Sequence, residues 1–154
     1  MTTTHRRISP SSQARNEIVA QHEYLRALVA RTLTLADNAA LSQEFVEELR
    51  RGAGALYDAL TRHMRFEEGV ISSAFRDVHS LGASLHDHLI EDHGRQRAAL
   101  TSAIEALDPE ALSGWALVQN VRVFVGALLT DMDQEEKVLL EADVDEMADD
   151  AQGG

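Results

Sequence analysis

The stretch TRHMRFEEGVI, residues 61–71, places a histidine four residues before a glutamate inside a helical pattern of apolar residues. Residues four apart on an α-helix differ by about 40° around its axis, so His63 and Glu67 share one face. Leu49 and Leu56 lie on the same face at heptad spacing, as core residues of a packed helix do. The helix is therefore expected to bury a histidine and a carboxylate together.

The rest of the chain repeats apolar residues at the same helical period, which predicts an all-α fold. Its only two prolines, Pro10 and Pro109, leave long stretches free of helix breakers. Short connections between long helices favour antiparallel neighbours, so the expected architecture is an up-down-up-down four-helix bundle. The expected helices cover residues 11–36, 42–75, 84–107 and 109 into the acidic tail, with Ser84 and Asp108 as N-caps of the last two. One domain, residues 11–146, is predicted, with residues 1–10 and 147–154 as flexible termini.

Composition excludes several classes of function. The chain has 154 residues, no cysteine and a formal charge of −12, so thiolate metal sites and disulfides are ruled out and nucleic acid is an unfavourable partner. The sequence lacks a membrane-spanning apolar run and the pattern of a secretory signal, so a cytoplasmic protein that does not enter the membrane is expected. Trp115 is expected in the core near the start of the last helix.

Each of the other helices also carries polar residues at core positions. Asp131 and Glu135 lie on the core rows of the last helix, His22 lies on that of the first, and His93 on that of the third. Buried carboxylates without a partner cost several kcal/mol or take up protons, so raised pKa values are expected for them in a metal-free protein. Nitrogen and oxygen donors of this kind are good ligands for cations. The negative charge of Glu67, Asp131 and Glu135 suits a dinuclear centre better than a single ion.

An internal echo strengthens the metal interpretation. The sequence HMRFEE at 63–68 aligns with DMDQEE at 131–136, and QHEYLRAL at 21–28 resembles DHGRQRAAL at 92–100. A lone histidine and glutamate four apart are commonly a surface hydrogen-bonded pair, but two related hairpins that both bury such groups favour a shared metal site. His86, seven residues before His93, is about 10 Å away along the helix and is expected to be a capping or supporting group.

These residues resemble those of the hemerythrin family, specifically the bacterial hemerythrin-like, HHE cation-binding proteins. The resemblance covers His22 through Glu135 and implies a non-haem di-iron centre, oxo- or hydroxo-bridged, although zinc or manganese also fits the donors. It implies that His22 and His63 hold one iron and His93 the other, with Glu67 and Glu135 as bridges. The full set of expected metal ligands is His22, His63, Glu67, His93, Asp131 and Glu135.

Two positions depart from the pattern of oxygen-carrying members, since Leu89 and Asp131 stand where those members have histidine. Fewer imidazoles and one more carboxylate favour the ferric state and leave room for a peroxide or diatomic ligand. The sequence therefore favours reaction with peroxide, oxygen or nitric oxide in redox defence or sensing, with peroxidase-like or catalase-like turnover as one form of it. Reversible oxygen binding, iron storage and a metal-free interaction module remain alternatives, and no protein partner is indicated.

Overall fold

The computed structural model describes residues 10–74, 80–105 and 114–152, and all of its regular structure within these ranges is helical. Its elements are α1 (Pro10–Leu41), a short 3₁₀ turn η1 (Gln43–Phe45), α2 (Val46–Ala74), α3 (Ser80–Glu105) and α4 (Gly114–Gln152). The all-α prediction is confirmed.

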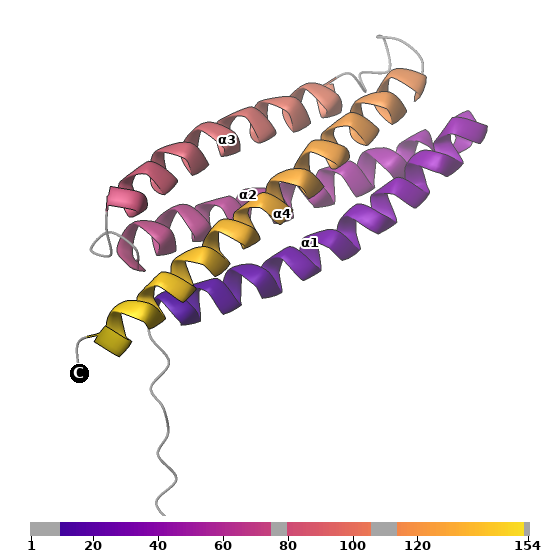
Figure 1. The fold of residues 1–154 in the computed structure, drawn as a ribbon. Coiled ribbons are helices and arrows are strands. Elements are labelled where there is room, and N and C mark those ends of the chain that lie inside the picture. The colour runs from indigo at the N-terminus through magenta and orange to yellow at the C-terminus, as the bar shows by residue number, and fades with distance from the viewer. Residues whose placement is uncertain (1–9, 75–79, 106–113, 153–154) are drawn as a thin grey trace, which may run out of the picture.

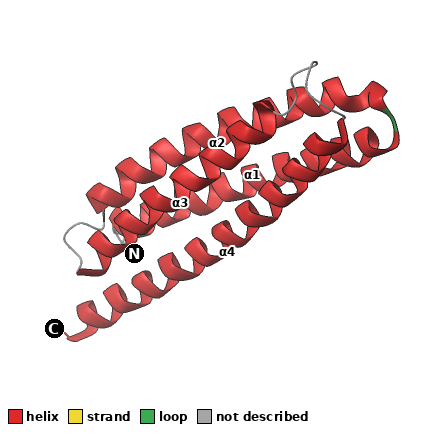
Figure 2. Ribbon diagram, turned by 90° about the horizontal axis from the view of Figure 1, so that it is seen from above, coloured by secondary structure: helices red, strands yellow, loops and turns green. Residues whose placement is uncertain are grey.

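The four long helices lie alongside one another, and each runs in the opposite direction to the one before it (Figures 1 and 2). The contacts form a closed ring, because α1 packs on α2, α2 on α3, α3 on α4 and α4 on α1. This is the up-down-up-down bundle expected from short connections. Residues far apart in sequence, on α1 and α4, are thereby brought side by side.

One layer of buried polar side chains crosses the bundle, and apolar side chains pack on both sides of it along the bundle axis. This layer is called the buried polar level below. A continuous core of leucine, valine, alanine, phenylalanine and methionine links α1, α2 and α4. Beyond it, His22, His63 and Glu67 are buried although they are polar. Ile18, one turn before His22, and Leu139, later on α4, are buried again. The polar groups are thus enclosed within the bundle.

Helix ends differ from the sequence prediction in four places. The second helix was expected from residue 42, but residues 43–45 form a 3₁₀ turn and α2 begins at Val46. α1 continues past Ala36 to Leu41, since the helix-forming residues after Asn38 include Ala39, which is buried. α3 begins at Ser80, so the prediction of Ser84 as its N-cap is wrong. α4 continues through residues 147–152, which were assigned to a terminus outside the domain. The predicted cap at Asp108 and the end of the second helix at residue 75 lie outside the described residues.

Two further observations concern the surface. Trp115 is 59% exposed, so its prediction as a core residue is wrong. It lies in the first turn of α4, where its neighbours Leu117 and Val118 take the buried positions instead. Within the described ranges, no helix combines the length and apolar character needed to cross a membrane.

Two glycines in α2 give a matched test of helix packing. A Cβ at Gly54 would meet nothing within 4 Å, whereas one at Gly52 would lie 2.6 Å from Cδ1 of Leu35 on α1. Gly54→Ala is expected to raise the free energy of unfolding by about 1 kcal/mol, because alanine loses less backbone entropy in a helix. Gly52→Ala should raise the free energy of unfolding by less, because the side chain of Leu35 must move to make room for the new Cβ. Urea unfolding of the metal-free variants measures this, and equal gains would contradict the close α1–α2 contact.

Candidate metal centre

All four helices contribute a side chain to the buried polar level. α1 supplies His22, α2 supplies His63 and Glu67, α3 supplies His93, and α4 supplies Glu135. The side chain of Glu135 is 11% exposed and the other four residues are 6% exposed or less. These five residues are called the metal centre below.

Four of them form a tight group. Ligand atoms of His22, His63, Glu67 and Glu135 lie within 4.8 Å of one another. Nε2 of His22 is 3.2 Å from Nε2 of His63 and 3.3 Å from Oε1 of Glu135. This four-residue group has two nitrogen and two carboxylate donors, a set that suits a first-row transition metal or zinc.

His93 joins the group through Glu67. The Nε2 atoms of His63 and His93 lie 3.2 Å and 3.0 Å from the same oxygen, Oε2 of Glu67. The other oxygen, Oε1, is 3.9 Å from Nε2 of His22. The carboxylate of Glu67 therefore faces imidazoles from three helices.

The outer nitrogen of each imidazole has its own oxygen partner. Nδ1 of His22 lies 3.0 Å from Oε1 of Glu136, and Nδ1 of His93 lies 3.2 Å from Oε1 of Glu68. Nδ1 of His63 lies 2.6 Å from Oε1 of Gln21. Ionised carboxylates only accept hydrogen bonds, so these contacts favour a proton on Nδ1 and leave a lone pair on Nε2.

The inner atoms, in contrast, lack hydrogen-bond partners. Both carboxylate oxygens of Glu67 and Oε1 of Glu135 are buried without one among the described residues. Neutral imidazoles protonated at Nδ1 cannot donate to them, and two Nε2 lone pairs facing each other at 3.2 Å repel. A cation bound between these atoms removes both costs, so the residues present fit a metal ion.

Arg26 fixes the partner of His22. Its guanidinium donates to both oxygens of Glu136, at 2.8 Å and 3.0 Å, and to Oδ1 of Asp133 at 2.8 Å. The hydrogen bond from Arg26 holds the pKa of Glu136 below its ordinary value, against the effect of burial and with help from His22. The same contact with Glu136 raises the pKa of Arg26. An ionised Glu136 is thus available to orient His22.

The charge at Glu67 differs from the sequence expectation. Burial raises the pKa of Glu67, but in the metal-free protein hydrogen bonds from Nε2 of His63 and His93, which a bound cation would replace, outweigh burial and bring it down to about 2. Burial lowers the pKa of His93, and Glu67 and Glu68 outweigh this and raise it above 6.5. The expectation of a raised pKa is therefore wrong for Glu67, because the imidazoles of His63 and His93 contact this carboxylate directly and outweigh its burial.

Asp131 does not belong to the four-residue group. Its Oδ2 accepts a hydrogen bond of 2.5 Å from Nε2 of Gln96 on α3. His88 is exposed, and its Nε2 lies 3.7 Å from Oδ2 of Asp92. The side chains of His86 and Leu89 are outside the described part of the structure.

Comparison with protein families agrees with this geometry. The family model of the hemerythrin HHE cation-binding domain matches residues 13–142. The chain belongs to the hemerythrin HHE cation-binding family. The match includes every residue of the metal centre, and domains of this family bind metal cations. Searches of the curated proteins and of the solved structures find no match.

Sequence reasoning missed the oxygen partners of the histidines in this HHE domain. The signal was present in the doubled glutamates of HMRFEE and DMDQEE. In each pair the first glutamate, Glu67 or Glu135, faces the centre. The second, Glu68 or Glu136, accepts from the histidine of a neighbouring helix. Gln21 and Arg26 carried no comparable signal, because their roles depend on which helices pack together.

The Arg26–Glu136–His22 chain can be tested with two variants. Glu136→Leu removes the acceptor at Nδ1 of His22 and is expected to weaken metal affinity by about 10- to 100-fold. Asp133→Asn is the matched control. Asp133 also accepts a hydrogen bond from Arg26, but this bond does not involve a histidine. Competition with a chelator for Co²⁺ or Zn²⁺ measures the metal affinity of both variants. Equal affinities in the two variants would show that Glu136 does not orient His22.

The pKa shifts predict how the stability of the metal-free protein depends on pH. The contribution of Glu67 is present above its ordinary pKa of 4.5 and is lost as pH falls toward 2. That of His93 is present below 6.5 and is lost as pH rises through the raised pKa. The Tm in chelator should therefore be highest between pH 4.5 and 6.5. Glu67→Gln should reduce the loss in acid, and an unchanged acid loss in that variant would contradict the assignment.

Proposed function

We propose that the protein is a non-haem di-iron protein that reacts with a small oxidant, such as peroxide, oxygen or nitric oxide, in redox defence or sensing. The observation that carries the proposal is the buried carboxylate of Glu67, which faces Nε2 atoms of His22, His63 and His93. Its oxygens lack hydrogen-bond donors among the described residues, although they are shielded from water. Such an arrangement is costly without a cation.

The geometry of Glu67 supports two ions instead of one. Oε1 lies toward His22, while Oε2 lies between His63 and His93. A carboxylate whose two oxygens face imidazoles on different helices is suited to bridge two positions. The first position takes His22, His63 and Glu135 as further donors, and His63 lies between the two positions because its Nε2 is 3.2 Å from Oε2. The second takes His93, and Asp131 lies one helical turn before Glu135 on α4.

The donor set favours iron and a reactive second position. Imidazole and carboxylate ligands suit iron, with manganese and zinc as further candidates. The second position has one imidazole, His93, and aspartate where oxygen carriers have histidine. An oxygen-rich set with few imidazoles favours the ferric state. Iron would supply the electrons, while Glu68 and Glu136 hold protons at Nδ1 of His93 and His22.

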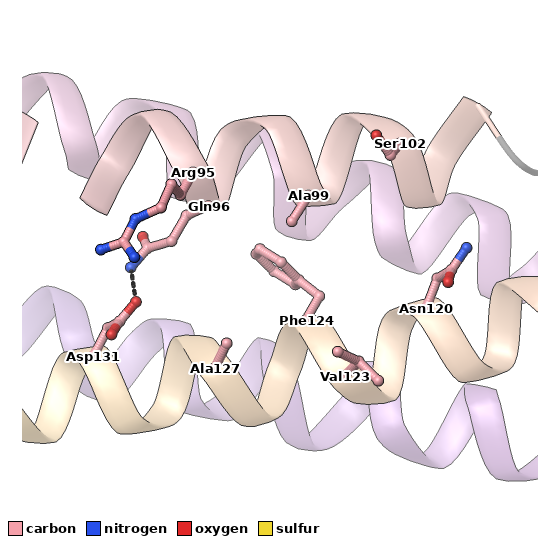
Figure 3. A pocket seen from close by; sticks show the side chains of 9 residues that line it. All are labelled: Arg95, Gln96, Ala99, Ser102, Asn120, Val123, Phe124, Ala127 and Asp131. Carbon is pink, nitrogen blue, oxygen red and sulfur yellow. Dashed lines mark hydrogen bonds between the residues drawn. The ribbon is translucent and has the colours of Figure 1, made fainter. Parts of the chain in front are cut away.

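A cleft supports access by small molecules. It has a volume of about 490 Å³ and lies between α3 and α4, lined by apolar residues such as Phe124 and by polar residues such as Asn120 (Figure 3). Gln96 and Asp131 lie at one end of it (Figure 3), each within about one turn of a residue of the metal centre. The alternative function, reversible oxygen or iron binding without turnover, uses the same residues and differs in reactivity.

Anaerobic loading with Fe²⁺ tests the proposal. About two iron ions per chain are expected, with one peroxide reduced to water for every two ferrous ions, again after each re-reduction of the iron by an added reductant, and no stable adduct when oxygen is admitted. Glu67→Ala should abolish loading at both positions, whereas Asp133→Asn should load normally, because Asp133 is exposed and not part of the metal centre. Iron content and peroxide consumption are measured on the same samples. One iron per chain would contradict the dinuclear centre, and a stable oxygen adduct without peroxide consumption would favour the carrier.

A further inference from the structure

The two halves of the bundle treat equivalent positions differently. When His22 is aligned with His93 and His63 with Asp131, Leu25 becomes equivalent to Gln96. Leu25 is an apolar, buried core residue. Gln96 is polar and nevertheless only 9% exposed. A buried amide needs a partner, and its partner is Asp131.

The residues that precede His22 and His93 also have different hydrogen-bond partners. Gln21, just before His22, accepts from Nδ1 of His63 and so leaves Nε2 facing the four-residue group. The equivalent residue before His93 is Asp92, which pairs with Arg95 of its own helix. The carboxylate of Asp131, at the position equivalent to His63, instead accepts a hydrogen bond from Gln96.

We infer that Gln96 is a positioning residue that restrains Asp131 from the second metal position and so sets how tightly that position binds a divalent cation. This inference rests on the proposed function. The amide of Gln96 donates to a carboxylate, and hydrogen bonds to a charged acceptor are stronger than neutral ones. While this bond holds Oδ2, only Oδ1 of Asp131 is left for a cation beside His93 and Glu67, so Asp131 binds that cation with both oxygens only after the bond breaks. The second ion is therefore bound more weakly than the first and exchanges through the cleft.

The cleft provides the space for this exchange. Gln96 and Asp131 face each other across its end, and their hydrogen bond joins α3 to α4 (Figure 3). Ala99 and Ala127 continue the lining with small side chains. A cation or small ligand in the cleft thus meets this pair at the end nearest the centre.

Titration with Co²⁺ under anaerobic conditions tests the inference, because its visible spectrum reports ligand number without any turnover. Gln96→Leu, which copies Leu25, is expected to tighten binding of the second equivalent about tenfold, the size of a lost hydrogen bond to a charged group. Gln96→Asn, which keeps an amide but shortens it, should act in the same direction. In an Asp131→Asn background, Gln96→Leu should have no effect. Gln43→Leu makes the same chemical change on exposed η1 and should leave both equivalents unchanged.

The outcomes separate this inference from the proposed function. Tight binding of one equivalent with a second equivalent indifferent to Gln96 would overturn the inference alone. An equal gain in affinity for the second equivalent when Gln96→Leu is made in wild type and in the Asp131→Asn background would also overturn the inference. The effect of Gln96 would then not depend on the carboxylate of Asp131. Failure of wild type to bind any Co²⁺ would overturn the proposed function and the inference together.

Discussion

The burial of Glu67 is the constraint on which the rest of the structure depends. Its side chain is fully enclosed, on the same face of α2 as His63, and a charge in that place needs compensation from every side. Nε2 atoms of His22 and His93 face it from α1 and α3, so a cation held between these atoms can supply that compensation. The bundle must therefore fix the axial register of three helices, α1, α2 and α3, around one carboxylate. The apolar core that continues along α1, α2 and α4 supplies that rigidity.

The histidines are useful only because their outer nitrogens are fixed. Glu136, Glu68 and Gln21 each accept from one Nδ1 and so turn Nε2 inward. Two of these acceptors come from the doubled glutamates, in which the first glutamate faces the centre and the second accepts a hydrogen bond from a histidine of a neighbouring helix. Arg26 extends the chain of contacts to the surface. The two halves differ in that Asp131 is hydrogen-bonded to Gln96, and under the proposed function this leaves one metal position complete and the other adjustable.

Periodicity and breakers predicted the class and topology of the fold, because helical amphipathicity and short connections constrain a bundle strongly. The same reasoning identified His22, His63, Glu67 and Glu135, which the structure brings together. It did not predict that Asp131 bonds Gln96, because that contact depends on how α3 and α4 pack. Helix ends at Leu41 and Ser80 were also missed, since local propensity there is weak and tertiary contacts decide. The exposure of Trp115 depends on the rotation of α4, which heptad counting fixes poorly at a helix start.

The central claim is that three imidazoles present Nε2 to a cation shared with Glu67. Nitrogen-15 NMR of the histidine side chains in protein loaded with ¹¹³Cd²⁺ tests it most directly. The account predicts protons on Nδ1 and cadmium couplings to Nε2 of His22, His63 and His93, with His88 unaffected. Coupling through Nδ1, or spectra of those three residues unchanged by the metal, would contradict it.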